Sequence, residues 1–401
     1  MTIKKPKRHG LRIAASTVAL CALPWSIAQA TQGTMPHGYG VKSEGMGGVV
    51  MALPQDALVG ASNPAGMVQV GDRLDLGVAF LKVDQGAEFA GTDYEASHDR
   101  DLYVIPQLGL NKMLDERSSI GLSLVGNGVG TGYASSDNIG GLQSPGSEFQ
   151  QMVGTLSYSR QLNEVHSVGV GLLLIRQALD IDGTASIGLP EGRDVAYGTG
   201  LRLGWMARLS DEITFGASYA TRGYMSKMDR FENLLAEDGD MDMPETYGMG
   251  LAYQKDRLTL GLDVQRIMWA DVKSLANPGV GSATGAPGSS NGPGFGWQNQ
   301  TVWRVGAAYD VLPELTLRAG YNHGSKLIDS QDTYLGLLAP SANRRHATAG
   351  ATYRLDNGHE LSMAYARSFK EKVKGDGPGP DGLTNVYMGQ HWLSLSYGIA
   401  F

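Results

Sequence analysis

The sequence predicts an all-β protein: a transmembrane barrel of about 14 antiparallel strands, with an N-terminal segment, the hatch, held inside its lumen. Three observations support this prediction. Apolar residues alternate with polar ones along many short stretches, the connections alternate between short and long, and a glycine-rich stretch precedes the first strand. No run of 18 or more apolar residues follows residue 30, which excludes membrane-spanning helices. The 56 glycines are about twice the ordinary usage.

The alternation has a period of two residues. Leu258, Leu260, Leu262 and Val264 are separated by polar residues or glycine, and the same pattern occurs in 200–205, 315–322 and 393–401. Such alternation places one set of side chains on each face of a sheet. A soluble β-sandwich and a transmembrane barrel both have this pattern, because each buries one face in an apolar surrounding.

Loop lengths distinguish the two architectures. The connections near Asp115, Asn163, Asp211, 255–256, 312–313 and 357–358 are short, whereas those at 85–100, 132–148, 183–193, 224–244, 270–296, 324–343 and 371–385 are long. The expected strands are 73–84, 101–111, 118–131, 149–160, 165–182, 194–208, 212–223, 245–254, 257–269, 297–309, 314–323, 344–354, 359–370 and 386–401. An even strand count with short turns on one side and long loops on the other is typical of outer-membrane barrels.

Aromatic residues on the apolar parity are predicted to form two girdles at the membrane interfaces. The girdle near the short turns comprises Tyr158, Trp205, Tyr253, Tyr309 and Tyr353, and the girdle near the long loops comprises Tyr219, Trp269, Tyr321 and Tyr365.

Residues 1–30 are predicted to be a secretory signal peptide, with a basic start, an apolar run and the small-x-small site Ala28-Gln29-Ala30. Cys21 is the only cysteine and lies inside this segment, so no disulfide is expected in the mature chain. Five of the 33 lysines and arginines lie here, which leaves 28 bases against 40 acids and a net charge of −12. This charge argues against nucleic acid as a partner.

The stretch 38–67 lacks both helical and strand periodicity. It contains Gly45, Gly47 and Gly48, then Asp56, then the tight turn Asn63-Pro64-Ala65-Gly66. Irregular backbone of this kind persists at membrane depth only when protein encloses it. We therefore expect a hatch at 31–71 and a barrel at 72–401.

These residues also support a family assignment. The GMGG run, Asp56 and the Asn-Pro-Ala-Gly-Met sequence ahead of the first strand resemble the hatch of FadL/TodX-type outer-membrane channels. The resemblance implies passive uptake of a hydrophobic small molecule, without a cofactor or metal, by a monomer in the outer membrane of a Gram-negative bacterium. The aromatic last residue, Phe401, resembles the ends of barrels that the outer-membrane barrel assembly machinery inserts, which makes that machinery an expected partner.

The third expected strand loses its alternation at Gly126, Asn127, Gly128 and Gly130. Glycines within a strand indicate a bulge, a kink or a close approach. The resemblance implies that a kink here opens the wall sideways and releases ligand into outer-membrane lipid. Many members have Pro-Phe-Gly near this position where this chain has Asn127-Gly128, and a glycine-rich bend without an opening is the alternative.

Parity assigns Arg202, Arg304, Arg318 and Asp263 to the lumen, the last three at similar depth on consecutive strands. Guanidinium groups bind carboxylates bidentately, so these arginines are candidates for binding an anionic headgroup. The alternative is structural: Asp263 pairs with one arginine, or the arginines bind the hatch acids Glu44 or Asp56.

The predicted function is therefore uptake of long-chain fatty acids, with lateral release beside the third strand. The first alternative is uptake of aromatic hydrocarbons such as toluene or xylene, and a general porin or a lipid-modifying enzyme ranks below both. The sequence has no HExxH or CxxC motif, so no enzymatic activity is expected.

Overall fold

The structure, a computed structural model, describes residues 32–96 and 102–401. The predicted signal peptide 1–30, with Cys21, lies outside the described residues.

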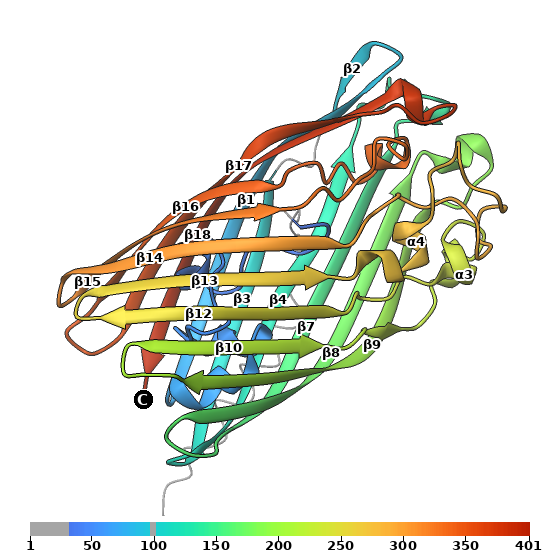
Figure 1. Ribbon diagram of the computed structural model, residues 1–401. Helices are drawn as coiled ribbons and strands as arrows, with labels where there is room; N and C mark the ends of the chain where they lie inside the picture. The colour runs from blue at the N-terminus through green and yellow to red at the C-terminus, as the bar shows by residue number, and fades with distance from the viewer. Residues whose placement is uncertain (1–31, 97–101) are drawn as a thin grey trace, which may run out of the picture.

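The wall is a closed antiparallel barrel of 14 strands (Figure 1). In chain order the wall strands are β1 (Arg73–Phe89), β3 (Leu102–Asp115), β4 (Ser118–Gly132), β7 (Gly146–Gln161), β8 (His166–Asp182), β9 (Gly192–Arg208), β10 (Ile213–Ala220), β12 (Thr246–Lys255), β13 (Leu258–Ile267), β14 (Gln300–Leu312), β15 (Leu315–Gly324), β16 (Arg345–Arg354), β17 (Glu360–Lys374) and β18 (Thr384–Ala400). Each wall strand pairs with its neighbours in sequence, and β18 pairs with β1 to close the ring. Each expected strand therefore has its counterpart in the wall.

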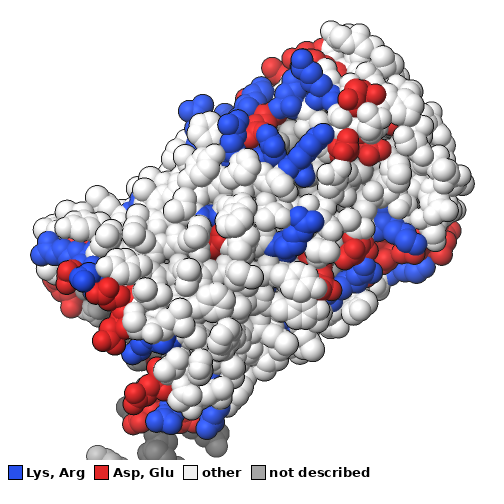
Figure 2. Space-filling model, in the orientation of Figure 1, with Lys and Arg blue, Asp and Glu red and all other residues white. Residues whose placement is uncertain are grey.

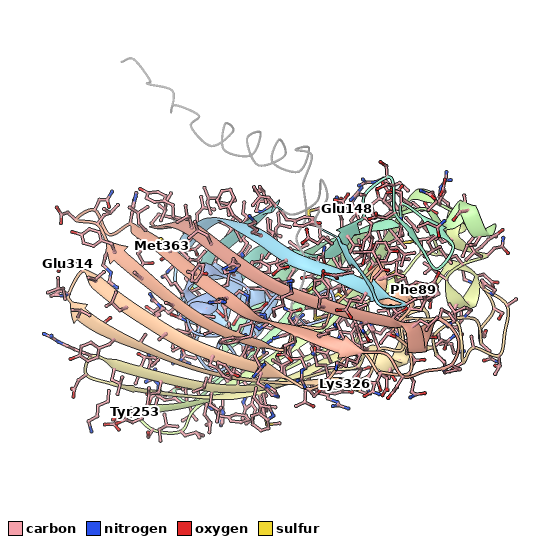
Figure 3. All side chains as sticks on the ribbon, turned by 90° about the horizontal axis from the view of Figure 1, so that it is seen from above. Phe89, Glu148, Tyr253, Glu314, Lys326 and Met363 are labelled. Carbon is pink, nitrogen blue, oxygen red and sulfur yellow. The ribbon has the colours of Figure 1, made fainter. Side chains whose placement is uncertain are left out.

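The two faces of the wall follow the predicted parity. Leu258, Leu260 and Leu262 are exposed, whereas Asp263, the next residue along the strand, is buried. Figure 2 shows charged side chains gathered toward the two ends of the barrel, with a largely uncharged belt between them. Seen from above, Glu314 lies at the short-turn end and Lys326 at the loop end (Figure 3). The outward apolar face is thus the surface that contacts lipid.

The predicted aromatic girdles need one correction. Trp269 does not lie on the outer face, because it belongs to a loop helix and is 1% exposed, with its ring 5.2 Å from that of Trp297. The prediction extended the alternation of the expected strand to residue 269, whereas β13 ends at Ile267. The outward tyrosines of the loop-end girdle, such as Tyr321 and Tyr365, are exposed.

Short elements form the loop end of the barrel. They are β2 (Thr92–Glu95), β5 (Asn138–Ile139), β6 (Leu142–Gln143), η3 (Thr184–Ile187), β11 (Tyr224–Met225), η4 (Asp229–Phe231), α3 (Ala236–Gly239), η5 (Trp269–Asp271), α4 (Lys273–Ala276), η6 (Leu335–Leu337) and η7 (Asp381–Leu383). Their apolar residues, including Phe231, Trp269 and Trp297, form a buried cluster with luminal residues such as Phe149 and Ile175. In the described chain, no helix has the length and apolar character needed to cross a membrane.

Residues 32–70 lie inside the barrel. They contain α2 (Val41–Glu44), η1 (Ala57–Ala61) and η2 (Pro64–Gln69), which have four, five and six residues. Almost every residue of this luminal segment is buried. The segment packs against the inner faces of β4, β7, β8, β16 and β17, among others. The barrel thus provides the enclosure that this irregular backbone requires.

Candidate functional site

Two wall carboxylates hold the luminal segment by its backbone. Asp263 Oδ2 accepts hydrogen bonds from the N–H groups of Val50 at 2.7 Å and Met51 at 2.9 Å. Asp75 Oδ2 accepts one from Ala57 N–H at 2.9 Å. Because buried N–H groups are costly to leave unpaired, these acids fix the segment against the wall.

Two residues of the segment organise its own turns. The side chain of Asp56 caps η1 by accepting from Leu58 N–H at 3.0 Å, and Asn63 caps η2 by accepting from Ala65 N–H at 3.1 Å. Asn63 Nδ2 also donates to the carbonyl of Met51 at 2.7 Å. Pro64 begins η2, where its missing N–H has no helical partner to lose.

Glycines on the inner face of the wall let the segment approach closely. A Cβ at Gly216 would lie 1.9 Å from the Met51 carbonyl oxygen, and one at Gly320 would lie 2.2 Å from the amide nitrogen of Gly47. Other wall glycines that approach this segment include Gly109, Gly169, Gly204, Gly261 and Gly306. The glycine-rich composition of the strands therefore follows in part from the volume of the segment that they surround.

A charged network holds the segment at α2. Lys42 Nζ lies 2.6 Å from Glu360, Glu360 lies 3.1 Å from Arg73, and Arg73 lies 2.6 Å from Asp75. The hatch acid Glu44 does not meet an arginine; its carboxylate accepts from Gln107 Nε2 at 2.6 Å. Burial raises the pKa of Glu44 to about 7, against hydrogen bonds from Ser394 and Gln107 that lower it.

Arg202 and Arg304 line one internal cavity of about 30 Å3 beside the luminal segment. Arg202 donates to the Ser62 carbonyl at 3.2 Å, and its Nε has no partner. Arg304 donates to the His37 carbonyl at 3.2 Å and to the side chains of Gln32 and Gln265 at 2.9 and 2.7 Å. Among the described residues, no carboxylate lies within 4.0 Å of either guanidinium. The cavity thus has two cationic side chains and room for about one water molecule.

The predicted grouping of the luminal charges holds only in part. Asp263 faces Arg304 across β13 and β14, but it binds Val50 and Met51 and makes no ion pair with the arginine. Arg318 does not lie at the depth of Arg304, because Arg304 faces Asn322, and four residues along a strand span about 13 Å. Arg318 instead donates to Gln55 at 3.2 Å and to Thr352 at 2.7 Å. Arg304 and Arg318 flank the same short turn, but Arg304 lies nine positions before Pro313 and Arg318 five positions after it, so their depths differ.

The wall contains a seam between β3 and β4. The two strands pair only where Leu108–Asp115 faces Ser118–Leu124, so Leu102–Gln107 and Val125–Gly132 have no ladder with each other in the described residues. On its other edge β4 pairs with β7 without a break from Ser118 to Gly132. The pairing with β7 therefore has no bulge at Gly126, Gly128 and Gly130, and the irregularity in the wall is the end of the β3–β4 ladder.

Other segments cover the free edge of β4. Gly128 N–H donates to the Thr34 carbonyl of the luminal segment at 2.9 Å, and Gly132 N–H donates to the carbonyl of Ala96 at 3.4 Å. Gln85 Nε2 donates to the Gly130 carbonyl at 2.8 Å. The seam is closed in this structure, since Gly126, Gly128 and Gly130, which have the outward parity, are buried.

A chain of side-chain hydrogen bonds links the seam to the loops. The Tyr39 hydroxyl donates to Asn127 at 2.5 Å, Asn127 donates to Gln151 at 2.6 Å, and Gln151 donates to Gln177 at 2.8 Å. Gln177 then donates to the Met241 carbonyl in the loop after β11 at 2.7 Å. Of these residues the sequence singled out Asn127 as a site residue; the glutamines gave no signal beyond their luminal parity.

Comparison with known proteins agrees with this architecture. A family model described as outer membrane protein transport protein (OMPP1/FadL/TodX) matches residues 27–381. The chain belongs to this family. It is an outer-membrane β-barrel that transports hydrophobic compounds, and the members with similar solved structures are channels and not enzymes.

The similar solved structures share the fold at low identity. They include the P. putida toluene transporter TodX, with 21% identity over 91% of this chain and 99% of that chain and a TM-score of 0.70. The Ralstonia pickettii toluene transporter TbuX has 17% identity over 91% and 99%, with a TM-score of 0.66. A Pseudomonas aeruginosa FadL homologue has 17% identity over 94% and 100%, with a TM-score of 0.68. Among curated proteins, no match was found.

Proposed function

We propose that this family member takes up long-chain fatty acids and that Arg202 and Arg304 receive the carboxylate. The observation that carries the proposal is the pair of buried guanidinium groups, 6% and 5% exposed, that share a cavity with no carboxylate partner. A buried charge without a counter-ion is unfavourable, and a carboxylate placed between the two would relieve that cost.

In this proposal the luminal segment is a movable hatch. A cavity of about 30 Å3 cannot hold a fatty-acid headgroup and its chain, so binding requires displacement of the residues that line it. Arg304 is occupied by His37 and Gln32, and a carboxylate would compete with both for its donors. These two residues flank Thr34, whose carbonyl caps the seam at Gly128. Binding of the headgroup would therefore release residues 32–39 and uncover the free edge of β4.

The exit follows from the position of the seam. Once residues 32–39 move, the unpaired edges of β3 and β4 border an opening toward the bilayer, at Gly126, Asn127, Gly128 and Gly130. Each methylene that passes from water to an apolar surrounding gains about 0.8 kcal/mol. Transfer from the medium to the lumen and then to the outer leaflet is therefore downhill for an acyl chain and needs no energy source.

The test compares a charged with an uncharged ligand. The double variant Arg202→Gln/Arg304→Gln should bind oleate about 10- to 100-fold more weakly in the purified protein, because charge-assisted hydrogen bonds contribute about 1.5 to 3 kcal/mol. Toluene binding should be unchanged. Arg318→Gln is the matched control, since Arg318 is also luminal but does not line the cavity. Equal losses for oleate and toluene, or wild-type oleate affinity in the double variant, would contradict the carboxylate assignment.

Uptake of aromatic hydrocarbons is the second candidate. The buried cluster above the luminal segment contains Trp269, Trp297, Tyr133 and Phe149, which suit a planar apolar ligand. Two of the similar structures are toluene transporters. For this candidate the arginines would hold only the hatch, and the double variant would alter toluene uptake as much as oleate uptake.

A further inference from the structure

The outer wall is basic near the loop ends of β1, β16 and β17, although residues 31–401 together carry a net charge of −12. Figure 2 shows lysine and arginine side chains gathered near the loop ends of β16 and β17, which Figure 1 labels. We call this set of side chains the cationic band. Its members are Lys82, Arg344, Arg345, Arg367 and Lys370.

A β-bulge in β17 turns part of the cationic band outward. The pairing of β17 with β18 shifts after Ser368, so that Phe369 and Lys370 together face Gly389. Arg367 is exposed before the bulge, and Phe369 and Lys370 are both exposed within it. A bulge re-aims the side chains that follow it, and a Cβ at Gly389 would lie only 3.1 Å from that of Lys370. The bulge therefore brings Lys370 to the same outer face as Arg367.

Strand register places a third exposed basic residue in line with Arg367. On the outer face Arg367 pairs with His391 of β18, and His391 pairs with Lys82 of β1. Neighbouring strands lie about 4.8 Å apart, so the Cα atoms of Arg367 and Lys82 lie about 10 Å apart. His391 Nδ1 is 2.6 Å from the hydroxyl of Tyr365, a residue of the loop-end girdle. Because the long loops of such barrels face the outside, this row lies at the level of the outer-leaflet headgroups.

Two acids lie within the cationic band, and both already bind its members. Glu371 accepts from Arg344 and from Arg345, each at 2.8 Å. Asp84 accepts from Lys370 at 2.9 Å. Five basic side chains thus face two acids, which leaves a surplus of three positive charges.

The surplus is concentrated at Arg367 and Lys82. Among the described residues, no carboxylate lies within 4.0 Å of either side chain. The remaining acids of this side of the barrel belong to the β1–β2 hairpin and are Glu88, Asp93 and Glu95. Glu95, for example, faces Gly86, which is four residues beyond Lys82 and hence about 13 Å farther along the strand. The row of Arg367 and Lys82 therefore offers two cations without acidic partners.

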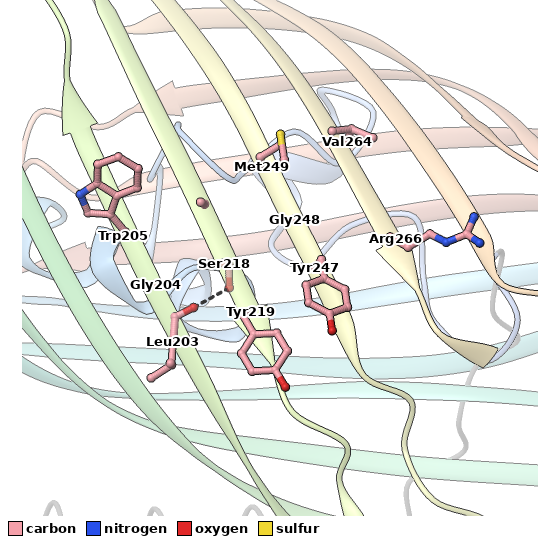
Figure 4. A pocket seen from close by; sticks show the side chains of 11 residues that line it. Leu203, Gly204, Trp205, Ser218, Tyr219, Tyr247, Gly248, Met249, Val264 and Arg266 are labelled. Carbon is pink, nitrogen blue, oxygen red and sulfur yellow. Dashed lines mark hydrogen bonds between the residues drawn. The ribbon is translucent and has the colours of Figure 1, made fainter. Parts of the chain in front are cut away.

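Another part of the outer wall at the loop end has no such surplus. A hollow of about 470 Å3 is formed by residues of β9, β10, β12 and β13, and Arg266 lies at its edge (Figure 4). Here the acid Glu245 accepts from the Tyr247 hydroxyl, and Tyr247 faces Arg266 across β12 and β13. One acid balances one base at this hollow, so it does not distinguish an anionic lipid from a neutral one.

We propose that the cationic band binds the phosphorylated glycolipid of the outer leaflet. A phosphate group lies between Arg367 and Lys82, and the acyl chains extend over the apolar row below them, which contains Tyr365, Leu393 and Phe80. Arginine binds phosphate bidentately, and clusters of basic residues at a membrane surface bind anionic headgroups. Phosphatidylethanolamine offsets its one phosphate with an ammonium group, so a band with surplus positive charge favours the glycolipid. The proposal does not depend on which compound the barrel transports.

The test is native mass spectrometry of the full mature protein with bisphosphorylated lipid A, with phosphatidylethanolamine as the comparison lipid. Wild-type protein should retain lipid A in preference to phosphatidylethanolamine. Arg367→Gln should weaken lipid A binding about fivefold, the usual effect of one basic residue at an anionic lipid surface. Lys82→Gln/Arg367→Gln should weaken it about 25-fold if the two residues act independently.

The matched control is Arg266→Gln, which removes an exposed arginine at the loop end of the same barrel but outside the cationic band. It should retain lipid A as the wild type does. All the substituted side chains are exposed, and heat-dependent gel mobility will show that each barrel is folded. Wild-type lipid A binding by the double variant, an equal loss in Arg266→Gln and Arg367→Gln, or no preference over phosphatidylethanolamine would overturn the proposal.

Discussion

The two edges of β4 differ in what holds them. On one edge, β4 and β7 exchange a continuous ladder from Ser118 to Gly132. On the other, the ladder with β3 stops at Leu124, and the remaining edge is covered by the carbonyls of Thr34 and Ala96 and by a side-chain amide. On the β7 edge the partner is a neighbouring wall strand throughout, whereas on the other edge the partner at Gly128 is Thr34 of the luminal segment.

This difference shows how a barrel can contain a movable part without losing its closure. A continuous ladder between wall strands resists local opening, because neighbouring pairs support one another. The contacts of residues 32–39 at the seam are few, and in the proposed function ligand or lipid replaces them. The luminal segment has the same division: residues 50–57 are held by Asp263 and Asp75, whereas Thr34 is held by the seam itself.

The largest expected effect comes from converting the seam into a fixed edge. A disulfide in Thr34→Cys/Gly128→Cys should tie the luminal segment to β4. Uptake should fall at least about tenfold, because the disulfide locks the closed state and leaves few molecules whose seam can open. Uptake should recover on reduction. The control pair, Thr155→Cys/Leu173→Cys, joins residues that already face each other across β7 and β8. Uptake by the oxidised seam variant at the wild-type rate would show that the seam does not open.

Removing an anchor of the luminal segment should have the next largest effect. Asp263→Ala leaves the N–H groups of Val50 and Met51 unpaired, which costs about 1 to 3 kcal/mol per group. We expect faster proteolysis of residues 41–70 in the folded barrel and higher ionic conductance. Asp310→Ala, an exposed acid at a short turn, is the control. Unchanged protection in Asp263→Ala would mean that the anchor is dispensable.

A smaller effect is expected from the chain of amides between the seam and the loops. Gln151→Leu removes the link between Asn127 and Gln177, and a typical hydrogen bond contributes about 1 kcal/mol. Hydrogen exchange should therefore increase at residues 32–39. Gln143→Leu, in an exposed hairpin, should leave this exchange unchanged. If Gln151→Leu alters exchange only in its own strand, the amides do not couple the seam to the loops.

The smallest expected effect is a pH dependence of the luminal segment. The pKa of Glu44 is raised to about 7 by burial, and that of Asp56 is raised to about 6 by burial and by Asp75. A raised carboxyl pKa means that the docked segment binds more protons than the released one between about pH 4.5 and 7, so docking weakens as the pH rises through this window. The protection factors for hydrogen exchange at residues 41–56, which remove the intrinsic pH dependence of amide exchange, should be lower at pH 8 than at pH 5.5. Glu44→Gln should reduce this difference in protection between the two pH values. If the difference is unchanged, a titrating group other than Glu44 causes it.

Much of the architecture follows from local pattern. Lipid on one side of the wall requires one parity to be apolar, and Leu258, Leu260 and Leu262 satisfy this without reference to the rest of the chain. The strand count, the loop side and the family could therefore be predicted from the sequence. The luminal parity of Arg202, Arg304, Arg318 and Asp263 followed from the same rule.

Relations between strands that are distant in sequence were decided by the tertiary structure. The stagger of the barrel brings Arg202 to the same cavity as Arg304, although 101 positions lie between them. Asp263 faces Arg304 yet binds the backbone of Val50 and Met51, because the segment inside the lumen offers unpaired N–H groups that no wall pattern reveals. A periodic sequence specifies which face a residue occupies; its depth and its partner depend on register and on what fills the lumen.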